Sequence, residues 1–206
     1  MKSFEAFLPH VMPKVPGCPE PTVIHCLRQA VIEFCQRTKL WRCDDEFDVT
    51  PASCDVICAP AGSQILDIEH ATFEGFPLDP ISIADLDAEY PRWRTDTDTT
   101  MPQYFTQIDF DTVRVVPAGT GKLKLYTILM PAEDGEDVPD WMHAKYARVI
   151  AAGALKDLLI TPGQPFYNAE LASGYASRFY DAMDTNASKR MRGQQRAPIR
   201  TRPQYL

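Results

Sequence analysis

The sequence predicts a mainly α-helical protein of the α+β class, with a three-helix bundle-like core, a β-rich insertion between its first and second helices, and an extended C-terminal tail. Apolar residues recur every three to four positions over residues 19–40 and 139–190, which is the spacing of one helix face. Short β-prone runs cut by Pro, Gly and Asp fill residues 44–131. We therefore expect a single domain over residues 1–190 and a basic tail over residues 191–206.

The first core helix is expected over residues 19–38. Pro19 and Pro21 fall in its first turn, where a helix tolerates proline. Its apolar stripe consists of Ile24, Leu27, Val31, Phe34, Cys35 and Thr38.

The insertion is expected to form a sheet with two unlike faces, because apolar and polar residues alternate over residues 122–127. A short helix over residues 82–91 is stopped by Pro91, and "AGTG" (118–121) is interpreted as a hairpin turn. The expected strands are residues 47–50, 53–59, 64–69, 103–117 and 122–131.

Two further helices are expected over residues 140–159 and about 168–189. The small residues 151–154 in the first of them allow another helix to approach closely. The second repeats Leu171, Tyr175, Phe179 and Met183 every four residues, and this stripe needs a helical partner.

The composition is that of a soluble globular protein, with 45% hydrophobic and 24% charged residues. No apolar run approaches the roughly 18–20 residues that cross a bilayer, so no membrane partner is expected. The opening "MKSFEAFLPH" lacks the pattern of a secretion signal. We therefore expect a reducing cytoplasm, where six cysteines remain free thiols.

The cysteine spacing disfavours a metal site or a local disulfide. Cys26 and Cys35 are nine residues apart, which places them on opposite faces of one helix. Cys54 and Cys58 would lie roughly 13 Å apart along a strand, beyond the reach of one zinc ion. Cys18 or Cys43 could still meet a distant partner, and a cysteine nucleophile paired with one of the four histidines stays open. We predict no metal and no catalytic residue.

Three acidic runs, residues 43–48, 85–91 and 132–140, lack the spacing of an EF-hand loop. "GTGKLKL" (119–125) lacks the Walker pattern and precedes an expected strand rather than a helix. We interpret all of these as solvated loops or turns and predict no cofactor.

Charge is unevenly distributed, because six basic residues and no acidic ones follow Asp184. This basic end has three interpretations: a solubilising segment, a nucleic-acid contact through phosphates, or an extended peptide that docks on a protein partner. Interspersed apolar residues favour the docked peptide. Its expected contact residues are Arg192, Arg196, Ile199, Arg200, Arg202, Tyr205 and Leu206.

The order of the motifs resembles the head-to-tail adaptor (connector) proteins of tailed bacteriophages. The resemblance rests on four stretches that together cover most of the chain. They are "FLPHVMPKVPGCPEPTVIHCLRQAVIEFCQRTKLWR", "LDAEYPRWR", "MPQYFTQIDFDTVRVVPA" and "VPDWMHAKYARVIAAGALKDLLITPGQPFYNAELASGYASRFYDAM".

The resemblance implies a non-enzymatic structural protein of the virion. Such adaptors form a homo-oligomeric ring, usually a dodecamer, between the portal protein and a downstream tail or nozzle protein at the head–tail junction. Genomic DNA passes through the ring, including during ejection, and assembly takes place in the host cytoplasm. In related adaptors the C-terminal segment grips the portal, which agrees with the docked-peptide interpretation.

Three other functions remain open from the residues alone. The first is a nucleic-acid-binding packaging or regulatory factor that uses residues 189–202. The second is a small hydrolase with an unrecognised acid or cysteine site. The third is a tail-completion or tail-terminator protein one ring further down.

Overall fold

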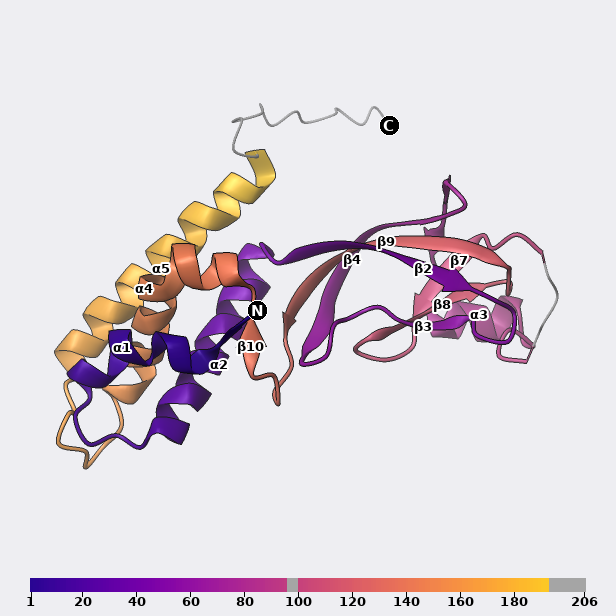
Figure 1. Cartoon of the computed structure of the whole chain (residues 1–206). Helices are drawn as coiled ribbons and strands as arrows, with labels where there is room; N and C mark the ends of the chain where they lie inside the picture. The colour runs from indigo at the N-terminus through magenta and orange to yellow at the C-terminus, as the bar shows by residue number, and fades with distance from the viewer. Residues whose placement is uncertain (96–99, 193–206) are drawn as a thin grey trace. The chain divides into compact units, whose positions relative to one another are not determined.

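The chain is divided into two compact units, each with its own core. The computed structural model describes residues 1–95 and 100–192, without the side chains of residues 188–192. The helical unit comprises Met1–Leu40 and the described residues from Glu133 onward, and the β unit comprises Trp41–Ala132 (Figure 1).

The predicted fold, a mainly helical bundle with a single β insertion, is wrong. The described residues form five α-helices and three separate sheets, which is an α+β fold. One of these sheets pairs β1 (Lys2–Ser3) with β10 (Asp137–Val138) inside the helical unit. Sequence periodicity did not reveal this pairing because it joins two-residue strands about 135 positions apart.

The helical unit is built on α2 (Glu20–Thr38), α4 (Asp140–Leu158) and α5 (Ala169–Arg192). Helix α4 packs against both α2 and α5. The close approach depends on Gly153, since a Cβ built there would lie 2.8 Å from the Ala30 Cβ and 2.8 Å from the Phe179 ring. Phe179 is fully buried as expected, but Leu171 is 53% exposed, so the apolar stripe of α5 begins later than its spacing predicts.

The N-terminal segment is part of the helical core. It consists of η1 (Phe4–Phe7), α1 (Leu8–Val11) and η2 (Met12–Lys14), and it contacts α2 and α4. Phe7 and Val11 are completely buried, and the Phe7 ring lies edge-on to His143 with 4.9 Å between ring centroids. The sequence predicted no helix in this segment, since its first expected helix begins at residue 19.

The larger sheet of the β unit has the strand order β2-β9-β4-β5, all antiparallel. Its two unlike faces follow the prediction: Leu123 and Leu125 are buried, while Lys122 on the other face pairs with Glu46 at 2.6 Å. Its strands are β2 (Arg42–Val49), β4 (Ser63–Phe73), β5 (Phe76–Pro77) and β9 (Gly121–Pro131).

The smaller sheet has the order β3-β8-β7-β6 and is accompanied by α3 (Ile83–Glu89). Its strands are β3 (Asp55–Ile57), β6 (Asp79–Pro80), β7 (Tyr104–Gln107) and β8 (Thr112–Val116). The "AGTG" segment therefore connects β8 to β9 in the other sheet, and the predicted hairpin there is wrong. The true hairpin in this region joins β7 to β8, within the single strand predicted over residues 103–117.

Candidate functional site

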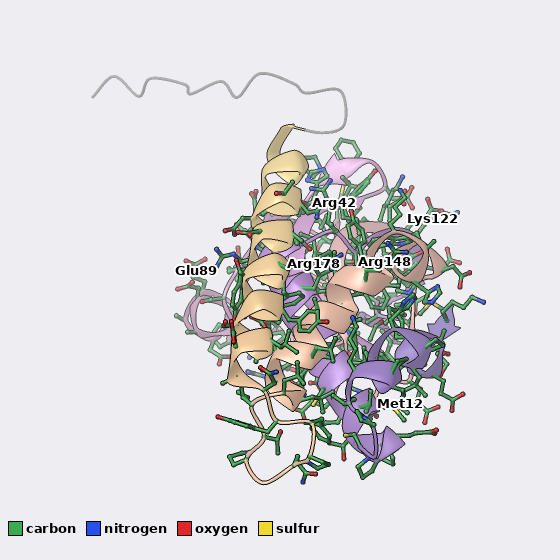
Figure 2. The ribbon with its side chains drawn as sticks, turned by 90° about the vertical axis from the view of Figure 1, so that its left-hand side faces the viewer. Met12, Arg42, Glu89, Lys122, Arg148 and Arg178 are labelled. Carbon is green, nitrogen blue, oxygen red and sulfur yellow. The ribbon has the colours of Figure 1, made fainter. Side chains whose placement is uncertain are left out.

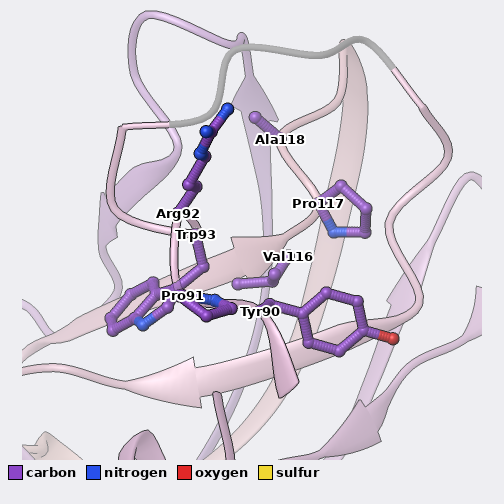
Figure 3. A pocket seen from close by; sticks show the side chains of 7 residues that line it. All are labelled: Tyr90, Pro91, Arg92, Trp93, Val116, Pro117 and Ala118. Carbon is purple, nitrogen blue, oxygen red and sulfur yellow. The ribbon is translucent and has the colours of Figure 1, made fainter. Parts of the chain in front are cut away.

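A concave pocket of about 300 Å³ lies in the β unit, where the segment after α3 meets the end of β8. Figure 3 shows the space between the Arg92 side chain on one side and the Pro117 ring on the other, with Tyr90 and Pro91 below. The pocket is lined by Tyr90, Pro91, Arg92, Trp93, Val116, Pro117 and Ala118.

Helix α3 positions one wall of the pocket. The Ser82 hydroxyl caps the helix by accepting a hydrogen bond from the Asp85 backbone N–H at 3.1 Å. Leu86 on the buried face of α3 packs with Trp93 and Val116 in a small apolar cluster. This cluster fixes Tyr90 and the turn after it, so the wall rests on a packed base.

Trp93 is held by both polar and cation–π contacts. Its indole Nε1 donates a hydrogen bond to Asp87 Oδ1 at 2.8 Å. The Arg94 guanidinium lies 4.3 Å from the ring centroid and that of Arg114 lies 5.3 Å away. Arg114 is itself anchored by Asp55, with Nη2 at 2.7 Å from Oδ2. Trp93 is consequently only 6% exposed.

Acidic groups surround the pocket. The Arg94 guanidinium, and then the Trp93 indole, hold the pKa of Asp87 below its usual value. Tyr90 and Tyr104 lie 5.9 Å apart between ring centroids. The hydrogen bond to Tyr90 is the largest cause that raises the pKa of Tyr104, and the carboxylates of Glu89 and Asp79 add to it. Both carboxylates thus lie close to the aromatic wall.

The chemistry of this pocket is that of recognition. Aromatic and proline rings with one cationic side chain bind apolar or extended peptide segments, and they supply no nucleophile beside a general base. Sequence reasoning missed the pocket because its two walls, residues 90–93 and 116–118, are separated by more than twenty positions. The only local signal was the aromatic and proline density of "YPRW".

Four of the cysteines, Cys26, Cys35, Cys43 and Cys58, do not have the properties of nucleophiles. Burial raises the pKa of Cys35 to about 12 and that of Cys58 to about 12, and it is the main cause that raises Cys26 and Cys43 to about 11. These thiols therefore stay protonated near neutral pH, whereas a reactive cysteine needs a lowered pKa. All six cysteines are free in the structure.

Within residues 1–95 and 100–192, no group of three or more His, Cys, Asp or Glu side chains is arranged to hold a metal ion. The helices in that part of the chain include none that is both long enough and apolar enough to span a bilayer.

The predicted docking residues fall at the end of the chain. Arg192 is the last residue of α5, and its side chain is not among those described. Arg196, Ile199, Arg200, Arg202, Tyr205 and Leu206 all lie outside the described residues. The helical unit also exposes Arg148 on α4 and Arg178 on α5 (Figure 2).

The acidic charge of the chain is concentrated in the β unit. Residues 41–132 contain sixteen acidic and six basic residues, a net charge of −10, whereas the rest of the chain has a net charge of +3. The sequence prediction distinguished the basic end of the chain and three acidic runs, but it did not assign the acidic charge to one unit. The unit that contains the pocket is therefore the strongly acidic part of the protein.

Comparison with known proteins identifies the family. A search of curated proteins finds no significant match. A family model described as "SU10 adaptor protein" matches residues 13–202, a span that includes both units and reaches into the basic tail. The match confirms the resemblance to phage head-to-tail adaptors. Because it covers most of the chain, the protein belongs to the SU10 adaptor protein family and is a phage adaptor, a component of the virion.

Proposed function

We propose that the protein forms a ring of twelve copies beneath the portal, joins the capsid to the tail, and lines the channel through which the genome passes. The family match over residues 13–202 is the main support for this proposal. The portal protein and a downstream tail or nozzle protein are its partners, and assembly takes place in the host cytoplasm. The role is structural and involves no covalent chemistry.

The charge of the β unit supports a conduit function. A net charge of −10 over residues 41–132 repels phosphates and so favours passage of DNA over its retention.

Exposed apolar side chains in both units support assembly. A closed ring needs two complementary patches on each copy, because head-to-tail contacts join different surfaces. The β unit exposes Ile57 (66%), Phe76 (61%) and Phe110 (70%). The helical unit exposes Ile160 (52%), Tyr167 (52%) and Leu171 (53%).

The basic C-terminal segment is the proposed portal-docking element. Arginines in this segment pair with acidic groups on the portal, while its apolar side chains fill a groove. The residues proposed for this contact are Arg192, Arg196, Ile199, Arg200, Arg202, Tyr205 and Leu206.

Electron microscopy of the purified protein with and without its portal tests the ring, and twelve-fold particles on the portal are expected. Deletion of residues 193–206 is expected to leave a folded body, by circular dichroism, that no longer attaches to the portal. Normal attachment of the truncated protein would show that the segment does not dock there.

The six basic residues after Asp184, unaccompanied by acids, favour one alternative, a nucleic-acid-binding packaging factor that uses residues 189–202. Fluorescence anisotropy with duplex DNA at increasing salt separates the two. Strong, salt-dependent binding by the isolated protein supports the alternative, and no binding at low salt argues against it. A tail-completion or terminator role would instead place the ring one level below the portal in the micrographs.

A further inference from the structure

Strand β2 forms one edge of the larger sheet of the β unit (Figure 1). Among the described strands it pairs with β9 alone, in a register that continues without a shift from Arg42 to Val49. At about 3.3 Å per residue, the strand is about 26 Å long. The side of β2 that faces away from β9 is therefore a long and regular open edge.

The hydrogen-bond pattern shows which residues face this open edge. In an antiparallel ladder, alternate residues turn both their N–H and C=O groups toward the partner strand. The Trp41 C=O, directly before β2, accepts a hydrogen bond from the Leu129 N–H of β9 at 2.7 Å, so the odd-numbered residues of β2 face β9. The residues whose backbone groups point outward are Arg42, Asp44, Glu46 and Asp48. Within the described parts of the chain, these outward groups have no backbone partner.

The other edges of the β unit are short or interrupted. β3 has three residues, and β5 and β6 have two residues each, the second of which is a proline. The part of β4 that β5 leaves uncovered contains two register shifts. Short length, proline and bulges all keep sheet edges from pairing. Because β2 has none of these protections, it is the described edge best suited to accept a further strand.

The side chains of β2 favour a basic partner. The strand has four acidic residues and one basic residue, a net charge of −3. Glu46 pairs with Lys122 of β9 at 2.6 Å. Asp44 and Asp48 are exposed on the same face and form no ion pair within the described residues. Two carboxylates along the open edge are thus available to basic side chains of a further strand.

The opposite face of β2 adds an apolar contact, because Phe47 is only half-buried there. Side chains of an added strand would lie opposite those of β2 at a Cβ–Cβ distance of about 4.5–5.5 Å. We propose that β2 binds an extended segment of another protein by strand addition, and that lysine or arginine alternates with apolar residues in this segment. Main-chain hydrogen bonds supply the affinity, and the alternation supplies the specificity.

A second copy of this chain offers no such segment among its described strands. Two β2 strands side by side would place acidic residues against each other. The strands at the other edges of the β unit, β3, β5 and β6, contain no basic residue. Lys122 and Lys124 alternate with leucines, but their strand β9 is already paired on both sides. The occupant is therefore a different protein.

This interface goes beyond the proposed ring. The exposed apolar side chains that support ring assembly lie outside β2, and the proposed portal contact uses the C-terminal segment. Strand addition is therefore measured on the free protein, without portal or ring.

Hydrogen exchange of the full chain, followed by NMR, tests the proposal with a synthetic peptide of four Lys-Val repeats. In the free protein, the outward amides of Asp44, Glu46 and Asp48 are expected to exchange rapidly, whereas the odd-numbered amides are already protected by β9. A saturating concentration of peptide is expected to slow exchange of the outward amides by at least about tenfold. Absence of binding, or binding without this slowing, would overturn the proposal. Protection that rises with protein concentration in the absence of peptide would also overturn it, because the edge would then belong to a second copy.

Two variants at one position separate charge from hydrogen bonding. Asp44→Asn removes a carboxylate and keeps the outward N–H, so the dissociation constant of the peptide should rise about twofold to fivefold, the range of one cross-strand pair. Asp44→Pro removes the same charge and also the outward N–H, which makes no bond to β9, and it should weaken binding about tenfold further. The matched control, Glu89→Gln, removes a carboxylate of the same unit outside β2 and should leave the affinity unchanged. Equal binding by the asparagine and proline variants would show that charge alone attracts the peptide.

Modified peptides give the same test without a change in the protein. Methylation of the backbone nitrogens of either the lysines or the valines removes the N–H donors of one peptide edge and keeps the charge. An added strand pairs with β2 through one edge only, so one of these peptides should lose binding and the other should retain it. Equal affinities of the two methylated peptides would refute strand addition.

Discussion

Replacing Gly153 by alanine is predicted to destabilise the helical unit, although alanine is the better helix former. The new Cβ would lie 2.8 Å from the Ala30 Cβ and 2.8 and 2.9 Å from two ring carbons of Phe179. Carbon atoms in favourable contact are about 3.5–4.0 Å apart. Ala30 is 1% exposed and Phe179 is fully buried, so neither neighbour has free space into which it can move.

The size of the effect follows from two opposed contributions. Overpacking of a buried site costs about 1–3 kcal/mol, and the upper part of this range applies because two helices must separate. Alanine has a higher helix propensity than glycine, and this difference offsets the cost by about 1 kcal/mol. We therefore expect the free energy of unfolding to fall by about 1–2 kcal/mol, combining these values.

Gly174 provides the matched control. It also lies inside a helix, α5, but a Cβ added there meets nothing within 4 Å. Gly174→Ala is thus expected to stabilise the unit by about 1 kcal/mol, so the two substitutions should have opposite signs. The measurement is urea unfolding followed by circular dichroism at 222 nm. The free energies of unfolding of the two variants are compared at the same m value, the slope of the free energy against urea concentration.

A double variant isolates the contact with α2. Ala30→Gly removes one of the two clashing groups, so Gly153→Ala should cost less in that background than in the native chain. If Gly153→Ala stabilises the protein as much as Gly174→Ala does, the close packing of α2, α4 and α5 at this glycine is wrong.

Three further predictions concern stability. Lys39 ends α2 with a left-handed backbone (φ 49°, ψ 41°), so Lys39→Gly should raise the free energy of unfolding by about 0.5–1 kcal/mol in urea titrations. Phe7 is fully buried, and Phe7→Ala should cost about 3–5 kcal/mol; a change below 1 kcal/mol by calorimetry would contradict its core position. Burial raises the pKa of Cys35 from 9.0 to about 12, so its contribution to stability is complete below pH 9 and is lost between pH 9 and 12. Between pH 8 and pH 10 the native chain should therefore lose more of its free energy of unfolding than Cys35→Ala does, by about 1 kcal/mol in urea titrations at both pH values.

The helices were predictable because their signal is local. The apolar spacing of residues 19–38 and 140–159 located α2 and α4 to within one residue at each end. Phe4, Phe7 and Val11 have the same spacing, but Pro9 and Pro13 concealed it, so the N-terminal contribution to the core was missed.

The sheets were only partly predictable, because strand pairing depends on distant partners. Strand β2 was predicted only from Phe47 because Asp44, Asp45 and Glu46 have low β propensity. Those acids are tolerated at the edge of the sheet, where Glu46 pairs with Lys122 and charge discourages pairing with a second copy of the chain. The pocket could not be predicted, since its walls come from segments that periodicity treats separately.

The charge distribution links these observations to function. A uniform acidic body would suit a DNA conduit but would not distinguish one unit from the other. The net charge of −10 in residues 41–132 instead combines repulsion of DNA with an acidic surround for an aromatic pocket in the same unit. The repulsion of phosphates should accordingly weaken as salt rises, because exposed charges are screened over about 10 Å at 0.1 M.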